Sequence, residues 1–280
     1  MRYNRQELVV GKVSGKVAIV GVGALGTVCS DLLVRAGFNV LLIDRDIVEL
    51  SNLQRQSLFL EEDVGKSKAI SAVNRLKLAN SSVNVEGTAI HLNSENISCL
   101  DSYDIIVDCT DNVKTRLLLN RYCKGNGKSW VYGAAIKDHG YVMTNPCIEC
   151  FLTVSGETCD TVGVLGGITH IIGSLQAQHV IDLVRGKERE GLFYVTFESI
   201  KKLHVKKNPS CAVCKGDFSL PVDDVKTIKF CGRNLYQVQG KVRKNVEYRE
   251  GITLFPDGRA LVKAGSEEEA LSVYSKFVGD

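Results

Sequence analysis

The sequence predicts an α/β protein with a Rossmann-like, doubly wound mixed sheet, and three observations lead to this fold class. The apolar run Val17–Val20 enters a glycine turn, and the turn opens a stretch whose apolar residues recur at helical spacing. A second apolar run, over 40–43, ends at an acidic residue, Asp44. Strand, glycine turn, helix, strand and acid in this order are typical of a mononucleotide-binding βαβ unit.

Each glycine of the turn, which reads Gly-Val-Gly-Ala-Leu-Gly, has its own expected task. Gly21 permits the tight turn, Gly23 lets the backbone approach a phosphate, and Gly26 lets the helix pack against the strand. The helix N-terminus attracts phosphate groups, and Asp44 is expected to accept hydrogen bonds from ribose hydroxyls. The pattern favours a nucleotide site over a purely structural turn, but it identifies neither the nucleotide nor the reaction.

Bulk composition is that of a soluble globular protein and argues against several function classes. Apolar residues make up 44% of the 280 residues and charged residues 24%, which are ordinary values. A net charge of +3 without a Lys/Arg-rich block argues against nucleic-acid binding. No apolar run suits a signal peptide or a membrane span, so we expect a cytoplasmic protein that does not bind membranes. In a reducing compartment, its ten cysteines are expected to be thiols, metal ligands or nucleophiles.

The main domain is expected over residues 1–216, because the character of the chain changes after the second cysteine pair; it begins with a short polar stretch over 1–15 that reads as a solvated arm. The expected strands of this domain, besides the two above, are 83–90, 104–108, 129–135, 140–144, 193–197 and 202–206. The further expected helices are 65–79, one after Asn112 that runs through Leu117, Leu118 and Tyr122, and 168–184.

Residues 217–280 differ in character and are predicted to form a small α+β unit with no chemical signature of its own. Short strands are expected over 228–231, 252–255 and 259–262, with a hairpin turn at Pro256-Asp257-Gly258. A final helix is expected to start at Ser266 with a capping box to Glu269. Its expected apolar face consists of Ala270, Leu271, Tyr274 and Phe277.

Two Cys-x-x-Cys pairs, Cys147/Cys150 and Cys211/Cys214, are the strongest metal signal in the chain. Each pair can hold two corners of a tetrahedron, so the two pairs together would form a closed four-thiolate zinc site. Such a site has no open coordination position, so its role would be structural, a staple between segments about 60 residues apart. Two independent redox pairs, or buried thiols, are the alternatives.

Two further segments, around Asp111 and around Lys66 and Lys68, each have a functional and a structural interpretation. Asp111 lies on a strand-to-helix turn at the same sheet edge as the glycine turn, where a carboxylate could bind Mg²⁺. Alternatively, Asp111 or Asn112 caps the following helix. Lys66 and Lys68 are expected in the first turn of the helix over 65–79, where a cation opposes the helix dipole. At least one of them could therefore have a functional role; the alternative is that both are ordinary surface lysines.

Seven motifs stand in a characteristic order along about residues 1–216: RYNRQ at 2–6, GVGALG at 21–26, DRD at 44–46, SNLQRQ at 51–56, VGKSK at 64–68, DCTDN at 108–112 and the two cysteine pairs. Together, these motifs resemble the ThiF/MoeB/HesA family of ubiquitin-activating-like adenylating enzymes.

The resemblance implies an ATP-dependent adenylyltransferase that activates the C-terminal Gly-Gly carboxylate of a ubiquitin-like β-grasp carrier protein. It implies that Arg5, Arg55 and Lys68 supply cations to the triphosphate, that Asn52 donates a hydrogen bond, and that Asp111 holds Mg²⁺. Arg5 would reach the site of a partner subunit, so a homodimer is implied. The implied nucleotide-binding residues are Gly21, Gly23, Gly26, Asp44, Asp46, Asn52, Arg55, Gln56, Lys68, Asp111 and Asn112.

Cys159 occupies the position near which sulfur-transfer and ubiquitin-activating relatives carry a cysteine that binds the carrier covalently. In other relatives that cysteine is dispensable, and the neighbouring Asp160 would raise the thiol pKa and so lower its thiolate fraction. The resemblance also implies a sulfurtransferase or a cysteine desulfurase as a partner, because no rhodanese-like segment is found in the sequence. Carriers for thiamin, molybdopterin, tRNA thiolation and protein conjugation are all compatible.

Two other functions compete with this interpretation. An NAD-dependent oxidoreductase would explain the glycine turn and Asp44, but it leaves the cationic set and the cysteine pairs unexplained. A non-catalytic scaffold that binds a carrier is the third candidate. For residues 217–280 we expect a role in covering or orienting the approach of the carrier. The histidines show no paired spacing with acids or cysteines and are read as structural or surface residues: His91, His139, His170, His179 and His204.

Overall fold

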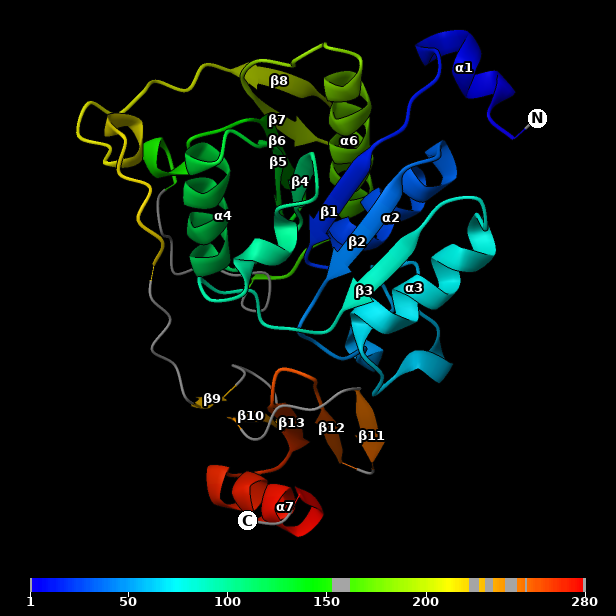
Figure 1. Ribbon diagram of the computed structural model, residues 1–280, viewed down its shortest axis with the longest axis vertical. Helices are drawn as coiled ribbons and strands as arrows, with labels where there is room; N and C mark the ends of the chain where they lie inside the picture. Colours follow the sequence, from blue (N-terminus) through cyan, green and yellow to red (C-terminus); the bar gives the residue numbers. More distant parts are fainter. Residues whose placement is uncertain are drawn as a thin grey trace.

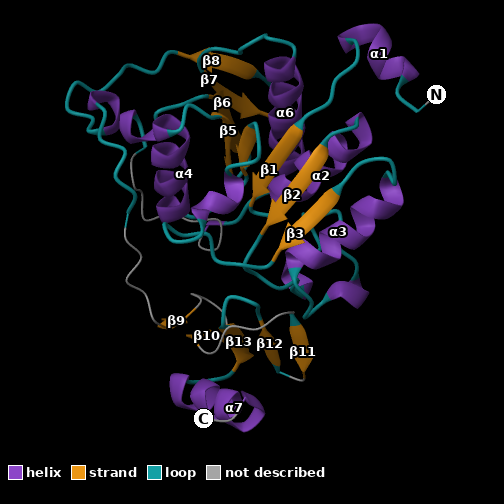
Figure 2. Cartoon of the chain, viewed as in Figure 1, coloured by secondary structure: helices purple, strands orange, loops and turns teal. Residues whose placement is uncertain are grey.

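The computed structural model describes residues 2–152, 162–221, 227–229, 234–239, 246–249 and 251–278. Within these residues, an eight-stranded sheet forms the larger part of the molecule, and a five-stranded sheet forms a smaller part near the C-terminus (Figure 1). The predicted fold class is confirmed: the larger sheet is mixed, and helices cover both of its faces (Figure 2).

The eight strands follow the order β3-β2-β1-β4-β5-β6-β7-β8. Strands β1 to β5 are parallel to one another, whereas β6, β7 and β8 pair antiparallel at the far side. The order reverses between β1 and β4, which is where ligands bind in open α/β sheets. The strands span β1 Lys16–Val20, β2 Asn39–Ile43, β3 Val85–Thr88, β4 Ile105–Asp108, β5 Ser129–Ile136, β6 His139–Thr144, β7 Leu192–Thr196 and β8 Ile200–Leu203.

Side-chain alternation along the central strands gives the molecule two cores. Val17 and Ile19 of β1 pack into one core with α2 (Ala24–Ala36), α3 (Lys68–Ala79) and α6 (Gly166–Val184). Ala18 and Val20 point to the opposite face, where α4 (Val113–Gly125) covers the sheet. The central strands are buried on both faces, as the near-continuous apolar runs predict.

Four elements of the larger part differ from the prediction. The strand expected over 83–90 is shorter, since β3 spans Val85–Thr88. The helix expected from residue 65 begins at Lys68, because Gly65 has a φ of +86° and the Ser67 side chain caps the helix. Strand β8 ends at Leu203, before most of the 202–206 segment expected to form it. The arm over 1–15 contains a short helix, α1 (Asn4–Val10), which buries none of its side chains. The start of this arm is nonetheless anchored, since the Tyr3 hydroxyl lies 3.1 Å from that of Ser82.

The smaller sheet is antiparallel, in the order β11-β12-β13-β10-β9, and α7 (Glu267–Val278) packs against it. The predicted hairpin joins β12 and β13, and the cap is present, since the Glu269 amide donates to the Ser266 hydroxyl at 3.2 Å. Leu271 was wrongly assigned to the apolar face of the helix: it is exposed, and Val273 packs against the core instead. The strands span β9 Thr227–Lys229, β10 Leu235–Gln239, β11 Glu247–Arg249, β12 Ile252–Leu254 and β13 Arg259–Lys263.

Strands β10 and β11 lie outside every predicted element, and the end of the strand expected over 228–231 lies outside the described residues. The division of the chain at residue 216 stays a prediction. Among the helices of the described ranges, none combines the length and the apolar character needed to cross a membrane.

Candidate active site and metal centre

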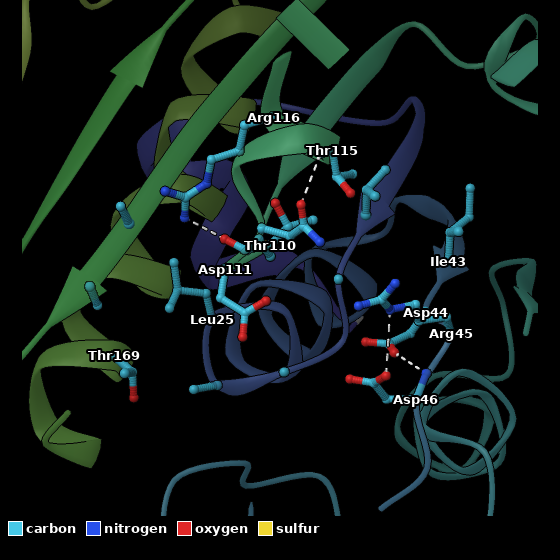
Figure 3. A pocket seen from close by; sticks show the side chains of 18 of the residues that line it. Leu25, Ile43, Asp44, Arg45, Asp46, Thr110, Asp111, Thr115, Arg116 and Thr169 are labelled. Carbon is cyan, nitrogen blue, oxygen red and sulfur yellow. Dashed lines mark hydrogen bonds and ion pairs between the residues drawn. The ribbon is translucent and has the colours of Figure 1, made fainter. Parts of the chain in front are cut away.

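A pocket of about 350 Å³ opens at the carboxyl ends of β1, β2 and β4, at the point where the strand order reverses (Figure 3). The glycine turn and the start of α2 line it on one side of the sheet edge. The segments after β2, β3 and β4 supply most of its polar side chains. Its lining contains most of the residues expected to bind a nucleotide: Gly21, Gly23, Asp44, Asp46, Arg55, Gln56, Lys68, Asp111 and Asn112.

The glycine turn has the geometry that the motif predicts. Gly21 has a φ of +89°, and a Cβ there would lie 2.7 Å from the Cys109 carbonyl oxygen. A Cβ on Gly26 would lie 2.0 Å from the Gly21 carbonyl oxygen, so the helix needs glycine to pack this closely. A Cβ on Gly23, in contrast, would meet only the Gln56 side chain, at 3.8 Å. The space above Gly23 therefore faces the pocket, where a phosphate could approach the N-terminus of α2.

Asp44 is buried at the end of β2, and both of its carboxylate oxygens accept backbone hydrogen bonds. Oδ2 accepts from the Val22 amide at 2.6 Å, which ties it to the glycine turn, and Oδ1 accepts from the Asp46 amide at 2.7 Å. Burial raises the pKa of Asp44, while the nearby ammonium of Lys68 acts in the opposite direction. The carboxylate oxygens keep lone pairs for ribose hydroxyls, so the expected role is compatible with this geometry.

Lys68 is not a surface lysine: its side chain is buried, and its ammonium lies 3.4 Å from Asp46 Oδ2. The fold places this cation at the first residue of α3, where it opposes the helix dipole, and the carboxylates of Asp44 and Asp46 offset that cost. Lys66, considered with it in the sequence, precedes the helix and is exposed.

Arg55 and Gln56 line the pocket, whereas Asn52 is not among its lining residues. Asn52 is buried within the short 3-10 helix Leu50–Asn52, where its Oδ1 accepts from the Glu49 amide at 3.2 Å. The buried Gln56 Oε1 has no hydrogen-bond partner among the described residues.

The cap of α4 is Asn112, not Asp111. The Asn112 Oδ1 accepts from the amides of Lys114 at 2.9 Å and Thr115 at 3.3 Å. Asp111 is therefore left for the pocket, into which its exposed carboxylate points (Figure 3). A solvent-accessible carboxylate beside a phosphate-binding turn suits Mg²⁺.

The structure adds residues to the pocket that sequence reasoning missed. His91, read as structural or surface, lines the pocket and lies with its Nδ1 3.3 Å from Arg45 Nη1. Arg116 also lines it and stands over the Tyr132 ring, with Cζ 5.2 Å from the ring centroid. His91 comes shortly after β3, and the rule that ligands bind beyond the carboxyl ends of parallel strands could have identified it.

Two predicted residues are not part of this pocket. Arg5 is exposed on α1, and the residues that line the pocket within the same chain do not include it. Cys159 lies outside the described residues.

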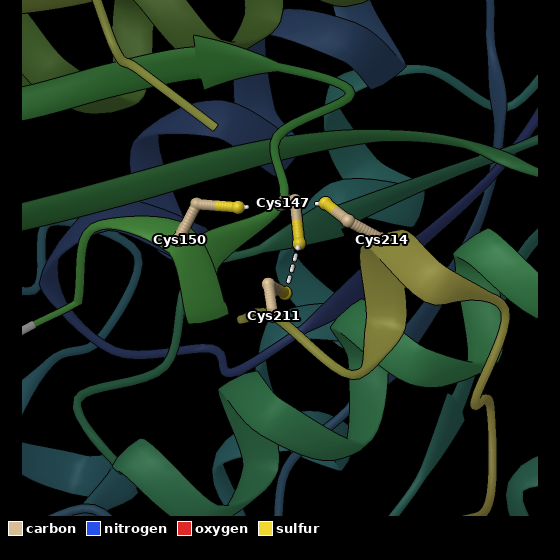
Figure 4. Close-up of side chains that lie close together, drawn as sticks. All are labelled: Cys147, Cys150, Cys211 and Cys214. Atoms are coloured by element: carbon tan, nitrogen blue, oxygen red, sulfur yellow. Dashed lines mark hydrogen bonds between the residues drawn. The ribbon is translucent and has the colours of Figure 1, made fainter. Parts of the chain in front are cut away.

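The four predicted metal ligands come together at a second place, between the short helix Ile148–Cys150 and the short helix Val213–Lys215 (Figure 4). The sulfur atoms of Cys147 and Cys211 lie 3.6 Å apart, those of Cys150 and Cys214 lie 3.4 Å apart, and all four lie within 4.8 Å of one another. A tetrahedral zinc site with Zn–S bonds of about 2.3 Å has sulfur atoms about 3.8 Å apart, so the cluster fits the ion.

The surroundings of the cluster also fit a cation. Burial and the neighbouring thiols raise the pKa of Cys147, and a bound cation would favour its thiolate form. Glu149, between the first two cysteines, forms an ion pair with Arg121 of α4 at 2.9 Å. The cluster is therefore anchored to the helix that follows the Asp111 turn.

The fold and the pocket define a nucleotide-binding α/β protein with a four-cysteine centre. The chain belongs to the ThiF family, which it matches over residues 12–213. It is 32% identical to the sulfur carrier protein ThiS adenylyltransferase of Bacillus subtilis (strain 168), and the match covers 99% of each chain. It is 34% identical to the molybdopterin-synthase adenylyltransferase of Escherichia coli (strain K12), over 76% of this chain and 96% of that one.

Among solved structures, the fold resembles that of Escherichia coli MccB crystallised with ATP. The TM-score is 0.66 at 23% sequence identity, and the match covers 77% of this chain and 75% of that one. At this identity the likeness is one of fold.

Proposed function

We propose that this protein is an ATP-dependent adenylyltransferase that activates the C-terminal Gly-Gly carboxylate of a ubiquitin-like β-grasp sulfur carrier or modifier protein. The observation that carries the proposal is a single pocket that gathers the glycine turn, the buried Asp44, the partly exposed Asp46, Lys68, Arg55 and Asp111. The two adenylyltransferase relatives are named for the sulfur carrier ThiS and for molybdopterin synthase, and they favour this substrate class over a nicotinamide dehydrogenase or a scaffold.

The proposed reaction is a displacement at the α-phosphorus of ATP. A carboxylate oxygen of the carrier forms a bond to this phosphorus, the bond to the bridging oxygen of the β-phosphate breaks, and pyrophosphate leaves with the bonding electrons. The product is a mixed carboxylic–phosphoric anhydride. Negative charge grows on the α-phosphoryl oxygens and on pyrophosphate, so cations and helix dipoles fixed in advance accelerate this step.

Different residues of the pocket would bind different parts of ATP. The N-terminus of α2 and Gly23 would hold phosphates, while Asp44 and Asp46 would orient the ribose. Arg55 and Lys68 would offset the charge of the triphosphate, and Lys68 is fixed for this role by its contact with Asp46. Asp111 would hold Mg²⁺, which when bound neutralises phosphate charge.

The four-cysteine cluster is proposed to bind a structural Zn²⁺. All four positions of the tetrahedron would be occupied by thiolates, so no position is left for a substrate. The ion would join the segment after β6 to the segment after β8, which are about 60 residues apart in the sequence.

A homodimer is also proposed, with Arg5 acting in the pocket of the partner. Support comes from α1, which buries no side chain within its own chain and exposes Leu8 and Val9 by 87% and 77%. Apolar side chains this exposed suit a protein interface. Residues 1–216 would form the adenylation domain and 217–280 the small unit, in the cytoplasm, with a sulfurtransferase or cysteine desulfurase as a further partner.

The proposal is tested by incubating the protein with ATP·Mg²⁺ and a purified Gly-Gly-ended β-grasp carrier, then trapping the product with hydroxylamine. We expect a carrier hydroxamate in the mass spectrum, and none with a carrier that lacks the last glycine. ATP·Mg²⁺, but not NAD, should raise the melting temperature of the protein. A protein stabilised by ATP that forms no hydroxamate with carriers of the thiamin, molybdopterin and tRNA-thiolation types would contradict the proposal and favour the scaffold.

A further inference from the structure

The small C-terminal sheet contacts the main domain behind the wall of the nucleotide pocket. Leu235, Phe255 and Leu261 of the small unit share a buried apolar cluster with Ala89, which follows β3. The partly buried Ile47, which follows β2, packs against the same cluster. The small unit is thus seated on the two segments that leave the carboxyl ends of β2 and β3.

Arg259, the first residue of β13, is the polar centre of this contact. Its side chain is only 2% exposed, and its Nη1 and Nη2 donate to the carbonyl oxygens of Arg45 at 3.1 Å and Ala89 at 3.2 Å. Its Nε pairs with Asp257 at 2.7 Å, and its guanidinium carbon stands 4.5 Å from the centre of the Phe255 ring. A guanidinium presents its donors in a rigid fork, so these contacts fix the distance between the two carbonyl groups.

The contacts around Arg259 reach the other segments that line the pocket. Asp257 accepts a hydrogen bond from the His91 amide at 3.2 Å. The Tyr248 hydroxyl accepts from the amide of Ser67, the cap of α3, at 2.7 Å. The small unit therefore holds the backbone beside Asp46, beside His91 and beside Lys68, three residues that line the pocket.

We propose that Arg259 is a positioning residue of the nucleotide pocket: by bridging the Arg45 and Ala89 carbonyl groups, it fixes the segments that carry Asp44, Asp46 and His91. The small unit then helps to hold the segments that line the ATP site, in addition to any role in guiding the carrier. The inference rests on the proposed function in that the ligand positioned is ATP.

Burying a guanidinium is costly, and the structure shows how the cost is met. Burial lowers the pKa of Arg259, and the carboxylate of Asp257 raises it again. The charge has one carboxylate and two carbonyl oxygens as partners, which is the condition under which a buried cation is tolerated. An apolar residue would fill the same place at lower cost, so the bridge between the two carbonyl groups is the property that arginine adds.

The test measures binding of Mg²⁺ and a non-hydrolysable ATP analogue by calorimetry, with the full chain and the variants Arg259→Met and Arg259→Lys. For Arg259→Met we expect a Kd raised about tenfold, which is about 1.4 kcal/mol. Arg259→Lys, which keeps the charge but loses the fork, should fall between it and the wild type. Lys263→Met, an exposed position at the end of the same strand, is the matched control and should bind as the wild type does.

Circular dichroism establishes that each variant is folded at the temperature of the titration. If Arg259→Met does not fold, Asp257→Asn, which weakens the ion pair and keeps the shape, should raise the Kd about threefold, about 0.65 kcal/mol. Folded variants that bind the analogue as tightly as the wild type would overturn the inference. The readout is nucleotide binding alone, so a wild type that binds the analogue but forms no acyl-adenylate would contradict the proposed function and leave this result standing.

Discussion

Replacing the buried Lys68 with methionine tests how far its ammonium stabilises the two carboxylates beside it in the pocket. The Lys68 ammonium lies 3.4 Å from Asp46, whose side chain is 26% exposed. Two unit charges at that distance attract by about 1 kcal/mol in water and about 5 kcal/mol at an effective dielectric constant of 20. Methionine has a similar volume but no charge, so the change leaves two carboxylates beside each other without a large cavity. We expect the free energy of unfolding to fall by about 2 kcal/mol at pH 7.5, between these limits.

The stability lost in Lys68→Met should depend on pH, and the buried Asp44 determines in which direction. Burial raises its pKa above the ordinary value of 3.8, so the folded protein holds this proton at pH values where the unfolded chain has released it. Stability therefore falls as the pH rises through that interval. Protonation removes a charge that Lys68 compensates, so the difference between wild type and Lys68→Met should shrink as the pH falls through the raised pKa.

Urea unfolding followed by circular dichroism, at pH 7.5 and at pH 4.5, measures both quantities. Lys66→Met is the matched control, because Lys66 is exposed and precedes the helix. The two variants should also differ in activity. Lys68→Met should reduce kcat/KM for ATP about 100-fold or more, as when a fixed transition-state contact is removed, whereas Lys66→Met should not. Equal stability losses for the two variants, or a loss unchanged between the two pH values, would refute this reasoning.

Three further expectations concern the metal centre, the dimer and Cys159. Cys214→Ser should lower the zinc content measured by mass spectrometry from about one ion per chain to near zero and reduce the melting temperature; retained zinc would contradict the four-thiolate site. Mixed Arg5→Ala and Asp111→Ala proteins, each inactive alone, should regain about one quarter of wild-type activity, since half of randomly exchanged dimers carry one complete site. No recovery after subunit exchange would exclude action in trans. Cys159→Ala should spare adenylation and stop carrier thiocarboxylation, and unchanged thiocarboxylation would remove the covalent role.

The parts of the fold that depend on local pattern could be predicted from the sequence. The apolar run of β1, the glycine turn and the spacing along α2 each leave a signal within a few residues. The start of α3 was placed three residues early because a positive φ at Gly65 cannot be read from helical periodicity. Strands β10 and β11 are short, and their pairing depends on β13 and β12, so local composition alone gives little signal for them.

The polar residues that line the pocket, and Arg259 behind its wall, divide in the same way. Asp44, Lys68 and Asp111 stand in motifs, and the structure brings them to one pocket. His91 and Arg259 have no motif: His91 reaches the pocket because β3 lies beside β2 in the sheet, and Arg259 contacts a carbonyl group 170 residues away in the chain. The contact of Arg259 follows from the packing of the small unit on the main domain, which sequence pattern does not encode locally.

The most direct test of the central claim is ATP–pyrophosphate exchange, measured with and without a Gly-Gly-ended β-grasp carrier, for the wild type, Arg55→Ala and Asp111→Ala. Exchange requires that the enzyme form the anhydride and reverse its formation, so it reports the adenylation step itself. We expect exchange that depends on the carrier in the wild type and is lost in both variants. ATP binding without exchange in the presence of any cognate carrier, or exchange undiminished in both variants, would contradict the account.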